Sequence, residues 1–277
     1  MFVAGVDAVV TVDSEALKRV VARVKKLAAD YEPPTFDHVP NPDAALFLSA
    51  IDHQTGYSEP HMVDGEGPYE GSALLWALGL RAERRAPGAL TARSLMGVPA
   101  EAIAAVFRAG QDNLHDPLRR AKLWDDLSKG MLKSYGGQAE QLIEASGGKL
   151  AGPGGALVRL SEFDAFADPL RKKAFLVCKI WERRGWLEVS DPESWEVSAD
   201  NVLMRLALRS GLVPESDVDE VREATRDAFK QVAEQAKIAP TVLDDLLWEK
   251  GREDPDLIGN DAGDLSEPPR REGVVFY

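Results

Sequence analysis

The sequence of 277 residues predicts an all-α protein with little or no sheet. Apolar residues recur at intervals of three and four positions in one segment after another, and glycine or proline separates these segments. No segment shows a convincing strand alternation. Because 44% of the residues are hydrophobic, the chain is able to bury a sizeable core, and we expect a globular helical protein.

The expected helices follow one another along the chain. Ser14 is a candidate N-cap for the first helix, and Asp43 is a candidate N-cap for the second, which is apolar on most sides and therefore buried. Asp168-Pro169 predicts a helix with proline at its first position, and Asp200 stands directly before another apolar helix. In chain order we expect helices at residues 14–30, 44–52, 72–84, 91–96, 99–108, 117–135, 138–145, from 169, from 200 to 211, 216–237 and 241–250, with a flexible glycine-rich turn at 152–155 before residues 157–160.

The domain organisation is predicted from the same pattern. We expect one helical domain over residues 1–252, with two lobes at approximately 1–135 and 136–252. Residues 253–277 are acidic and rich in proline and glycine, which predicts an extended or loosely docked tail. Residues 53–71 are rich in Gly, Pro, His and Tyr without periodicity and predict a long loop, and long ordered loops are usually functional.

Composition limits the partners. The formal net charge of −13 argues against a surface that coats DNA uniformly, because duplex binding draws most of its affinity from Lys and Arg. Local basic clusters occur at residues 81–85, 119–122 and 171–173, although such clusters are more often solvated helix faces. No run of apolar residues is long enough for a membrane span, and the first residues lack a basic secretory signal region, so we expect a soluble, cytoplasmic protein without a membrane partner.

Cysteine and histidine usage favours a site without metal. The single cysteine, Cys178, lies in an apolar helical pattern and has no partner for an internal disulfide, so we expect it in the core. The four histidines form no H-x-x-x-H pair. We therefore expect no metal ion and no cofactor.

Asp200 and Lys172 are the candidate catalytic residues. The simplest interpretation of Asp200 is an N-cap, and a carboxylate in that position stays ionised because the helix dipole and the N–H groups favour the charged form. Such a carboxylate is able to stabilise positive charge at C1′ of a ribose and to orient water. Lys172 and Lys173 begin a helix of core-like residues, so one of the two ammonium groups is a candidate to enter a cleft as a nucleophile or a phosphate ligand, while paired lysines are commonly surface features.

These segments resemble a known superfamily. The helix with Lys172-Lys173-Ala174, followed by the helix that Asp200 opens, resembles the catalytic core of the HhH-GPD superfamily of base-excision glycosylases. The resemblance implies a two-lobed, DNA-glycosylase-like helical fold with a central cleft, Asp200 as the essential acid and Lys172 as the lysine of bifunctional members. The glycine hairpin that grips DNA phosphates in typical members is missing before Arg171, and no cysteine follows residues 242–252, which excludes an iron–sulfur cluster.

The layout is closest to the queuosine salvage family of nucleotide N-glycosylases. The order of motifs over residues 40–250 resembles that family, with short motifs at residues 45–52, 73–78, 103–108, 135–137 and 163–168 ahead of the two key helices. In that family an aromatic and a basic residue typically follow the aspartate, whereas Asn201 and Val202 stand here. The resemblance implies a 7-deazaguanine type of nucleotide as substrate, without fixing the base.

A purine-like ring needs an aromatic face and hydrogen bonds at its edge. Candidates to supply them are Asp52, His53, Gln54, Tyr57, Tyr69 and Asn201. The leading hypothesis is an N-glycosidase that acts on a small-molecule nucleotide. DNA is the alternative substrate, with a base such as 8-oxoguanine, as in archaeal-type 8-oxoguanine glycosylases. The second alternative is a non-catalytic binding protein on the same fold.

Overall fold

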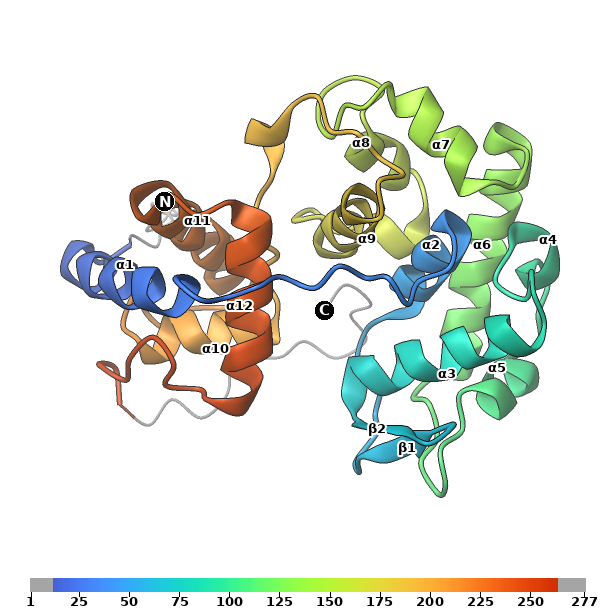
Figure 1. Ribbon diagram of the computed structural model, residues 1–277, viewed down its shortest axis with the longest axis horizontal. Coiled ribbons are helices and arrows are strands. Elements are labelled where there is room, and N and C mark those ends of the chain that lie inside the picture. The colour runs from blue at the N-terminus through green and yellow to red at the C-terminus, as the bar shows by residue number, and fades with distance from the viewer. Residues whose placement is uncertain (1–11, 264–277) are drawn as a thin grey trace, which may run out of the picture. The chain divides into compact units, whose positions relative to one another are not determined.

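The computed structural model describes residues 12–263, and their regular secondary structure is almost entirely helical (Figure 1). Within them the only sheet is an antiparallel hairpin of β1 (His61–Val63) and β2 (Glu66–Tyr69), in which His61 pairs with Tyr69. The predicted all-α fold with little sheet is confirmed. The hairpin lies inside the segment that the sequence predicted to be a loop.

The helices have the following bounds, in chain order: α1 (Ser14–Ala28), α2 (Pro42–Ile51), α3 (Gly71–Arg85), α4 (Ala92–Leu95), α5 (Ala100–Val106), α6 (Pro117–Tyr135), α7 (Ala139–Ser146), α8 (Ala156–Leu160), α9 (Lys172–Arg183), α10 (Asn201–Arg209), α11 (Val218–Ala236) and α12 (Pro240–Glu253). Short 3₁₀ turns, η1 (Asp164–Phe166) and η2 (Pro192–Ser194), occur in the connections.

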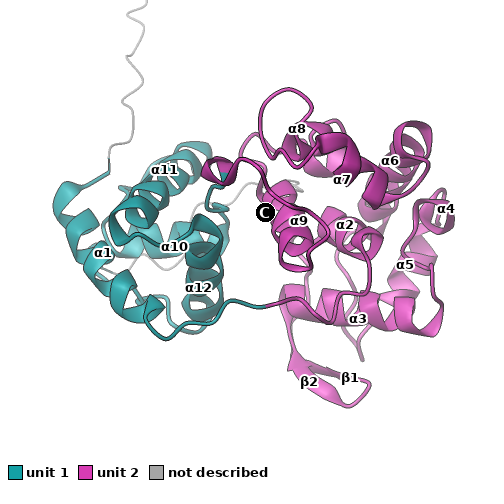
Figure 2. Cartoon of the chain, turned by 45° about the horizontal axis from the view of Figure 1, so that its top comes forward, with its two compact units in different colours: residues 1–34, 195–273 teal, residues 35–194, 274–277 magenta. Residues whose placement is uncertain are grey.

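The chain forms two compact units (Figure 2). In the described residues, unit 1 comprises residues 12–34 and 195–263, and unit 2 comprises residues 35–194. This grouping differs from the two consecutive lobes expected at 1–135 and 136–252. The reason is that α1 packs against α11 and α12 from the other end of the chain, while α2 packs against both α6 and α9.

Unit 1 is a four-helix cluster of α1, α10, α11 and α12. Its buried core combines one stripe of α1, including Val20 and Val24, with apolar residues of the other three helices. Gly251 lets α10 and α12 approach closely, since a Cβ there would lie 2.6 Å from Cδ1 of Leu206. Ile258 also lies in this core, so the first residues after α12 dock on unit 1 although a loose tail was predicted. The rest of that tail, residues 264–277, lies outside the described residues.

Unit 2 is built around α2, whose residues are nearly all buried and which packs against α3, α6, α7 and α9 (Figure 1). The side chain of Asn41, not of Asp43, caps this helix by accepting from the N–H of Ala44. Asp43 lies in the first turn and accepts from the N–H of Ala139 at 2.8 Å. A local pattern could not distinguish these roles, because Ala139 is 96 positions away.

Two other helix starts differ from the prediction. Asp13 caps α1 instead of Ser14, and α9 begins at Lys172, three residues after Pro169. Cys178 is fully buried in α9, as predicted. None of the helices within residues 12–263 combines the length and apolar character that crossing a bilayer requires.

Candidate functional site

Asp200 is the N-cap of α10, as predicted. Its backbone is extended, and its Oδ1 accepts from the N–H groups of Val202 at 2.9 Å and Leu203 at 3.0 Å. The residue is 7% exposed. Because two N–H groups and the positive end of the helix dipole face it, the carboxylate is favoured in its charged form.

The turn before Asp200 is held by two charged side chains of unit 1. Asp244 of α12 accepts from the N–H of Ser198 at 2.8 Å, and Nε of Arg222 of α11 donates to the carbonyl of Ala199 at 3.3 Å. Both side chains are buried. Sequence reasoning missed them, because contacts with residues 23 and 46 positions away leave no local pattern.

Asn201, a predicted substrate-binding residue, follows Asp200 directly. Its Oδ1 is buried and has no hydrogen-bond partner within residues 12–263. A buried acceptor without a partner is unfavourable by about 1–3 kcal/mol, so such atoms are uncommon in folded proteins.

Lys172 and Lys173 begin α9 in unit 2. Arg171 adopts a left-handed conformation before them, and Asp168 accepts from the N–H of Lys172 at 3.0 Å, so its carboxylate closes the first turn. Lys172 is half-buried, and its ammonium makes no hydrogen bond to the described part of the chain. It is therefore available to a ligand.

Lys173 is fully buried, which corrects the expectation of a solvated helix face at residues 171–173. Its Nζ donates to the carbonyl of Ala50 at 2.7 Å and lies 3.0 Å from Nδ1 of His53. Burial and the charge of Lys172 hold the pKa of Lys173 well below its ordinary value.

Asp52 and His53 occupy the end of α2. Oδ2 of Asp52 accepts from Oγ of Ser72 at 2.7 Å and from Nε1 of Trp76 at 3.0 Å, so α3 fixes this carboxylate. Both Asp52 and His53 are buried. Together with Lys173 they form one polar cluster at the end of α2, which we call the α2 corner.

Arg120 completes the α2 corner. It is fully buried on α6, although the sequence suggested a solvated face there, and its guanidinium donates to the carbonyls of His53, Gln54 and His115. Burial lowers its pKa to about 10. A buried guanidinium that binds several carbonyls fixes the path of the chain beyond α2.

The other predicted substrate-binding residues of unit 2 differ in their surroundings. Gln54 is exposed and has a positive φ of 33°. The hydroxyl of Tyr57 donates to the carbonyl of Phe107 at 2.7 Å, and burial raises its pKa, so this tyrosine is tied to α5. Tyr69 and Trp76 both line a cavity of about 100 Å³ beside the hairpin, and Trp76 also donates to Asp52.

Positive charge gathers around His53. Its pKa is held far below the ordinary value, first by burial and then by the charges of Lys173, Arg120, Lys172 and Arg119. Arg119 is exposed and Lys172 is half-buried. A chain of net charge −13 therefore carries a locally cationic region at the α2 corner.

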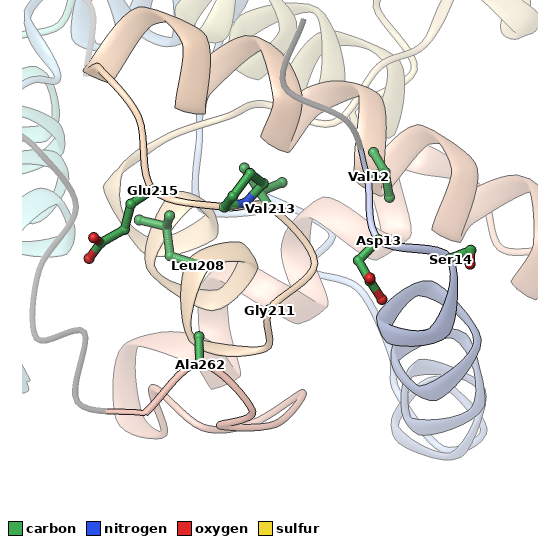
Figure 3. A pocket seen from close by; sticks show the side chains of 9 residues that line it. Val12, Asp13, Ser14, Leu208, Gly211, Val213, Glu215 and Ala262 are labelled. Carbon is green, nitrogen blue, oxygen red and sulfur yellow. The ribbon is translucent and has the colours of Figure 1, made fainter. Parts of the chain in front are cut away.

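A larger cavity of about 710 Å³ lies in unit 1 (Figure 3). Asp13, Leu208, Val213 and Glu215 are among its lining residues. Because Leu208 is near the C-terminal end of α10, the cavity is at the opposite end of this helix from Asp200, roughly 12 Å along its axis. Within the described residues, no group of three or more His, Cys, Asp or Glu side chains is arranged to hold a metal ion.

The structure thus brings Asp52, His53 and Lys173 together within unit 2, whereas Tyr69 lines the cavity beside the hairpin. Lys172 belongs to the same unit, whereas Asp200 and Asn201 belong to unit 1.

Comparison with known proteins identifies the fold. No known family and no curated protein matches the sequence. Among solved structures, a trapped endonuclease III–DNA covalent intermediate matches with a TM-score of 0.55 and 14% identity, over 88% of each chain. The 8-oxoguanine DNA glycosylase from Pyrobaculum aerophilum, solved with 8-oxoguanosine, has a TM-score of 0.49 and 19% identity, over 87% of this chain and 89% of that one. This chain has the helical fold of endonuclease III.

Proposed function

We propose that this protein is a base N-glycosylase that hydrolyses the bond between a modified base and C1′ of its sugar. The observation that carries the proposal is Asp200, a carboxylate at a helix N-terminus that accepts from two backbone N–H groups and follows a turn held by the buried side chains of Asp244 and Arg222. The fold shared with endonuclease III supports it.

Asp200 has two roles in this reaction. As the C1′–N bond breaks, the base leaves with the electron pair and positive charge develops at C1′, which a nearby carboxylate stabilises. A water molecule adds its oxygen to C1′ and gives a proton to Asp200, and the departing base takes up a proton from solvent, to which Asp200 later returns its own. Lys172 places the phosphate or the base, and Asn201 offers its unpaired Oδ1 to a donor on the substrate.

A base in DNA is the substrate class that the fold favours, because the matched endonuclease III structure is a covalent complex with DNA. The cationic region around His53, with Arg119 exposed and Lys172 half-buried, supports contacts with a phosphate backbone. A modified nucleotide of the 7-deazaguanine type is the second candidate. The net charge of −13 favours it, since a small nucleotide meets less repulsion than a long polyanion.

The direct test is to incubate the full chain with oligonucleotides that carry single modified bases, 8-oxoguanine among them, and with modified nucleoside monophosphates. Free base is measured by mass spectrometry. Release from an oligonucleotide supports the DNA assignment, and release from a monophosphate alone supports the second candidate. If no member of either set releases base, the protein is better described as a binding protein on this fold.

Asp200→Asn should lower the rate of base release by about 10²–10⁴-fold, because the amide neither carries charge nor accepts the proton. Asp217→Asn is the matched control, since Asp217 caps α11 with the same pair of hydrogen bonds, from the N–H groups of Asp219 and Glu220. Equal rates for the two variants would refute the role of Asp200.

Lys172 is tested by trapping. If its amine attacks C1′, borohydride should reduce the resulting Schiff base and link the protein to the oligonucleotide. Lys172→Gln should abolish the link, and Lys133→Gln, which changes an exposed lysine of α6, should retain it. If base is released but no covalent link to the oligonucleotide forms, the role of Lys172 is that of a phosphate or base ligand.

A further inference from the structure

The burial of Lys173 calls for an explanation. Its amine nitrogen is completely removed from water and forms no ion pair within residues 12–263. A buried charge is strongly unfavourable, which is why the pKa of this group is lowered, and an apolar residue would suit the core of unit 2 better. The two groups that the amine contacts, the Ala50 carbonyl and Nδ1 of His53, indicate what it does.

The contact with His53 selects one tautomer of the imidazole. Nζ of Lys173 carries at least two hydrogens, one for the Ala50 carbonyl and one for Nδ1 of His53, and with Nδ1 as the acceptor the ring proton of a neutral imidazole lies on Nε2. The second donor of Lys173 holds the last turn of α2 through the Ala50 carbonyl, and Arg120 holds the carbonyl of His53. Both the ring and the backbone of His53 are therefore fixed.

Nε2 of His53 is the atom left for a ligand. It has no hydrogen-bond partner in residues 12–263, and the residue keeps 6% of its surface exposed. The charged groups that act on the ring are Lys173 and Lys172 from α9 and Arg120 and Arg119 from α6. Burial first, and then these positive charges, lower the pKa of the imidazole, so it stays neutral over the physiological range.

We propose that Lys173 is a positioning residue that fixes His53 in its Nε2–H form, so that this N–H is a constant hydrogen-bond donor to an acceptor atom of the substrate. The acceptor is a carbonyl oxygen or ring nitrogen of the base, or an oxygen of a phosphate. The role in substrate binding rests on the proposed glycosylase function, whereas the tautomer does not.

The tautomer is measured on the native full chain by two-bond ¹H–¹⁵N correlation of its four histidine rings. His53→Asn assigns the signals. The expected spectrum shows an unprotonated Nδ1 and a protonated Nε2 that do not change between pH 5.5 and 8. A ring protonated on Nδ1, or an equal mixture of tautomers, would overturn the proposal even if base release is found. If none of the oligonucleotides and monophosphates releases base, the glycosylase function is refuted. The tautomer result is independent of that outcome.

Lys173→Met tests the cause, because methionine has a similar length and no donor. The His53 ring should become a mixture of tautomers, whereas Lys133→Met should leave the spectrum unchanged. An unchanged His53 ring in Lys173→Met would show that another group sets the tautomer. If this variant does not fold, the spectrum of the native chain still decides the tautomer.

The donor role has its own matched pair of variants. The amide nitrogen of glutamine overlaps Nε2 of a histidine, and that of asparagine overlaps Nδ1. His53→Gln should therefore keep KM within about threefold, while His53→Asn should raise KM roughly tenfold with little change in kcat. Lys173→Met should raise KM only by the reciprocal of the Nε2–H fraction that remains, about twofold for an equal mixture. Equal KM values for the two His53 variants would contradict the donor role.

Two probes identify the acceptor. Guanosine and inorganic phosphate are titrated separately against the native chain, and the Nε2–H signal is followed. A shift with guanosine assigns the donor to the base, and a shift with phosphate assigns it to the backbone. No shift with either probe would refute the donor role.

Discussion

The side chain of Asp200 combines a structural and a chemical role, and the two can be separated by substitution. Asparagine is as good an N-cap as aspartate, whereas alanine has no acceptor for the N–H groups of Val202 and Leu203. Asp200→Ala should therefore lower the free energy of unfolding by about 1 kcal/mol, and Asp200→Asn by much less. Urea unfolding of both variants measures this, and equal losses would show that the cap contributes nothing.

Residues with local roles were predictable, and residues with distant partners were not. The cap at Asp200 needs only the next three positions, which is why the sequence indicated it. Lys173 contacts residues 120 and 123 positions away, so nothing near it in the sequence distinguishes it from the half-buried Lys172. Arg120 was overlooked for the same reason, since its main partner His53 is 67 positions away.

At the scale of elements, the junction of α2 and α7 contains a carboxylate with an unusual acidity. Burial and the charges of Glu140 and Glu83 raise the pKa of Asp43 to about 6, against the opposing effect of the Ala139 N–H. The folded protein therefore holds this proton more tightly than the unfolded chain. The resulting stabilisation is fully present below pH 4 and is lost as the pH rises through 6.

Asp43→Asn removes this dependence, because an amide oxygen still accepts from the Ala139 N–H and never ionises. The variant should be more stable than the parent protein by about 1–2 kcal/mol at pH 8, where solvent screening limits the effect, and the difference should vanish near pH 4. Urea unfolding at the two pH values measures it. A difference that does not change with pH would contradict the raised pKa.

Periodicity located the long helices but not the irregular elements. The bounds expected for residues 117–135 agree with α6, and the other long helices agree within a few residues. The hairpin escaped because its strands have three and four residues and include Gly67 and Pro68, which hide any alternation. The start of α9 was misplaced because Pro169 lies in the turn that Asp168 closes, ahead of the helix.

The whole molecule has a net charge of −13, so any contacts with DNA phosphates depend on local cationic side chains. The salt dependence of DNA binding reports how many phosphates such side chains contact. If Arg119 contacts a phosphate, Arg119→Gln should reduce the slope of log K against log salt by about 1. Arg93→Gln is the matched control, since Arg93 is also an exposed arginine of unit 2, on α4. Titration of a labelled oligonucleotide from 50 to 200 mM salt measures the slopes. Identical slopes for the two variants would exclude a phosphate contact at Arg119.

The fold class was predictable, but the grouping of the helices was not. Helical spacing reports which face of each helix is buried and not which partner covers it. The apolar stripe of α1 is covered by α11, about 200 positions later in the chain. Two lobes that follow the order of the sequence therefore separate α1 from the helix that it packs against.

The discontinuous make-up of unit 1 has a consequence for biosynthesis. All described residues of unit 2 are continuous in sequence, so this unit can fold while the chain is still growing. The apolar stripe of α1 leaves the ribosome early and has no partner until α11 has been made. At the usual elongation rate of roughly 5–20 residues per second, this wait lasts about 10–40 s. During that time the stripe is a potential site for aggregation or for binding by a chaperone, and unit 1 completes its core only after α11 and α12 have been made.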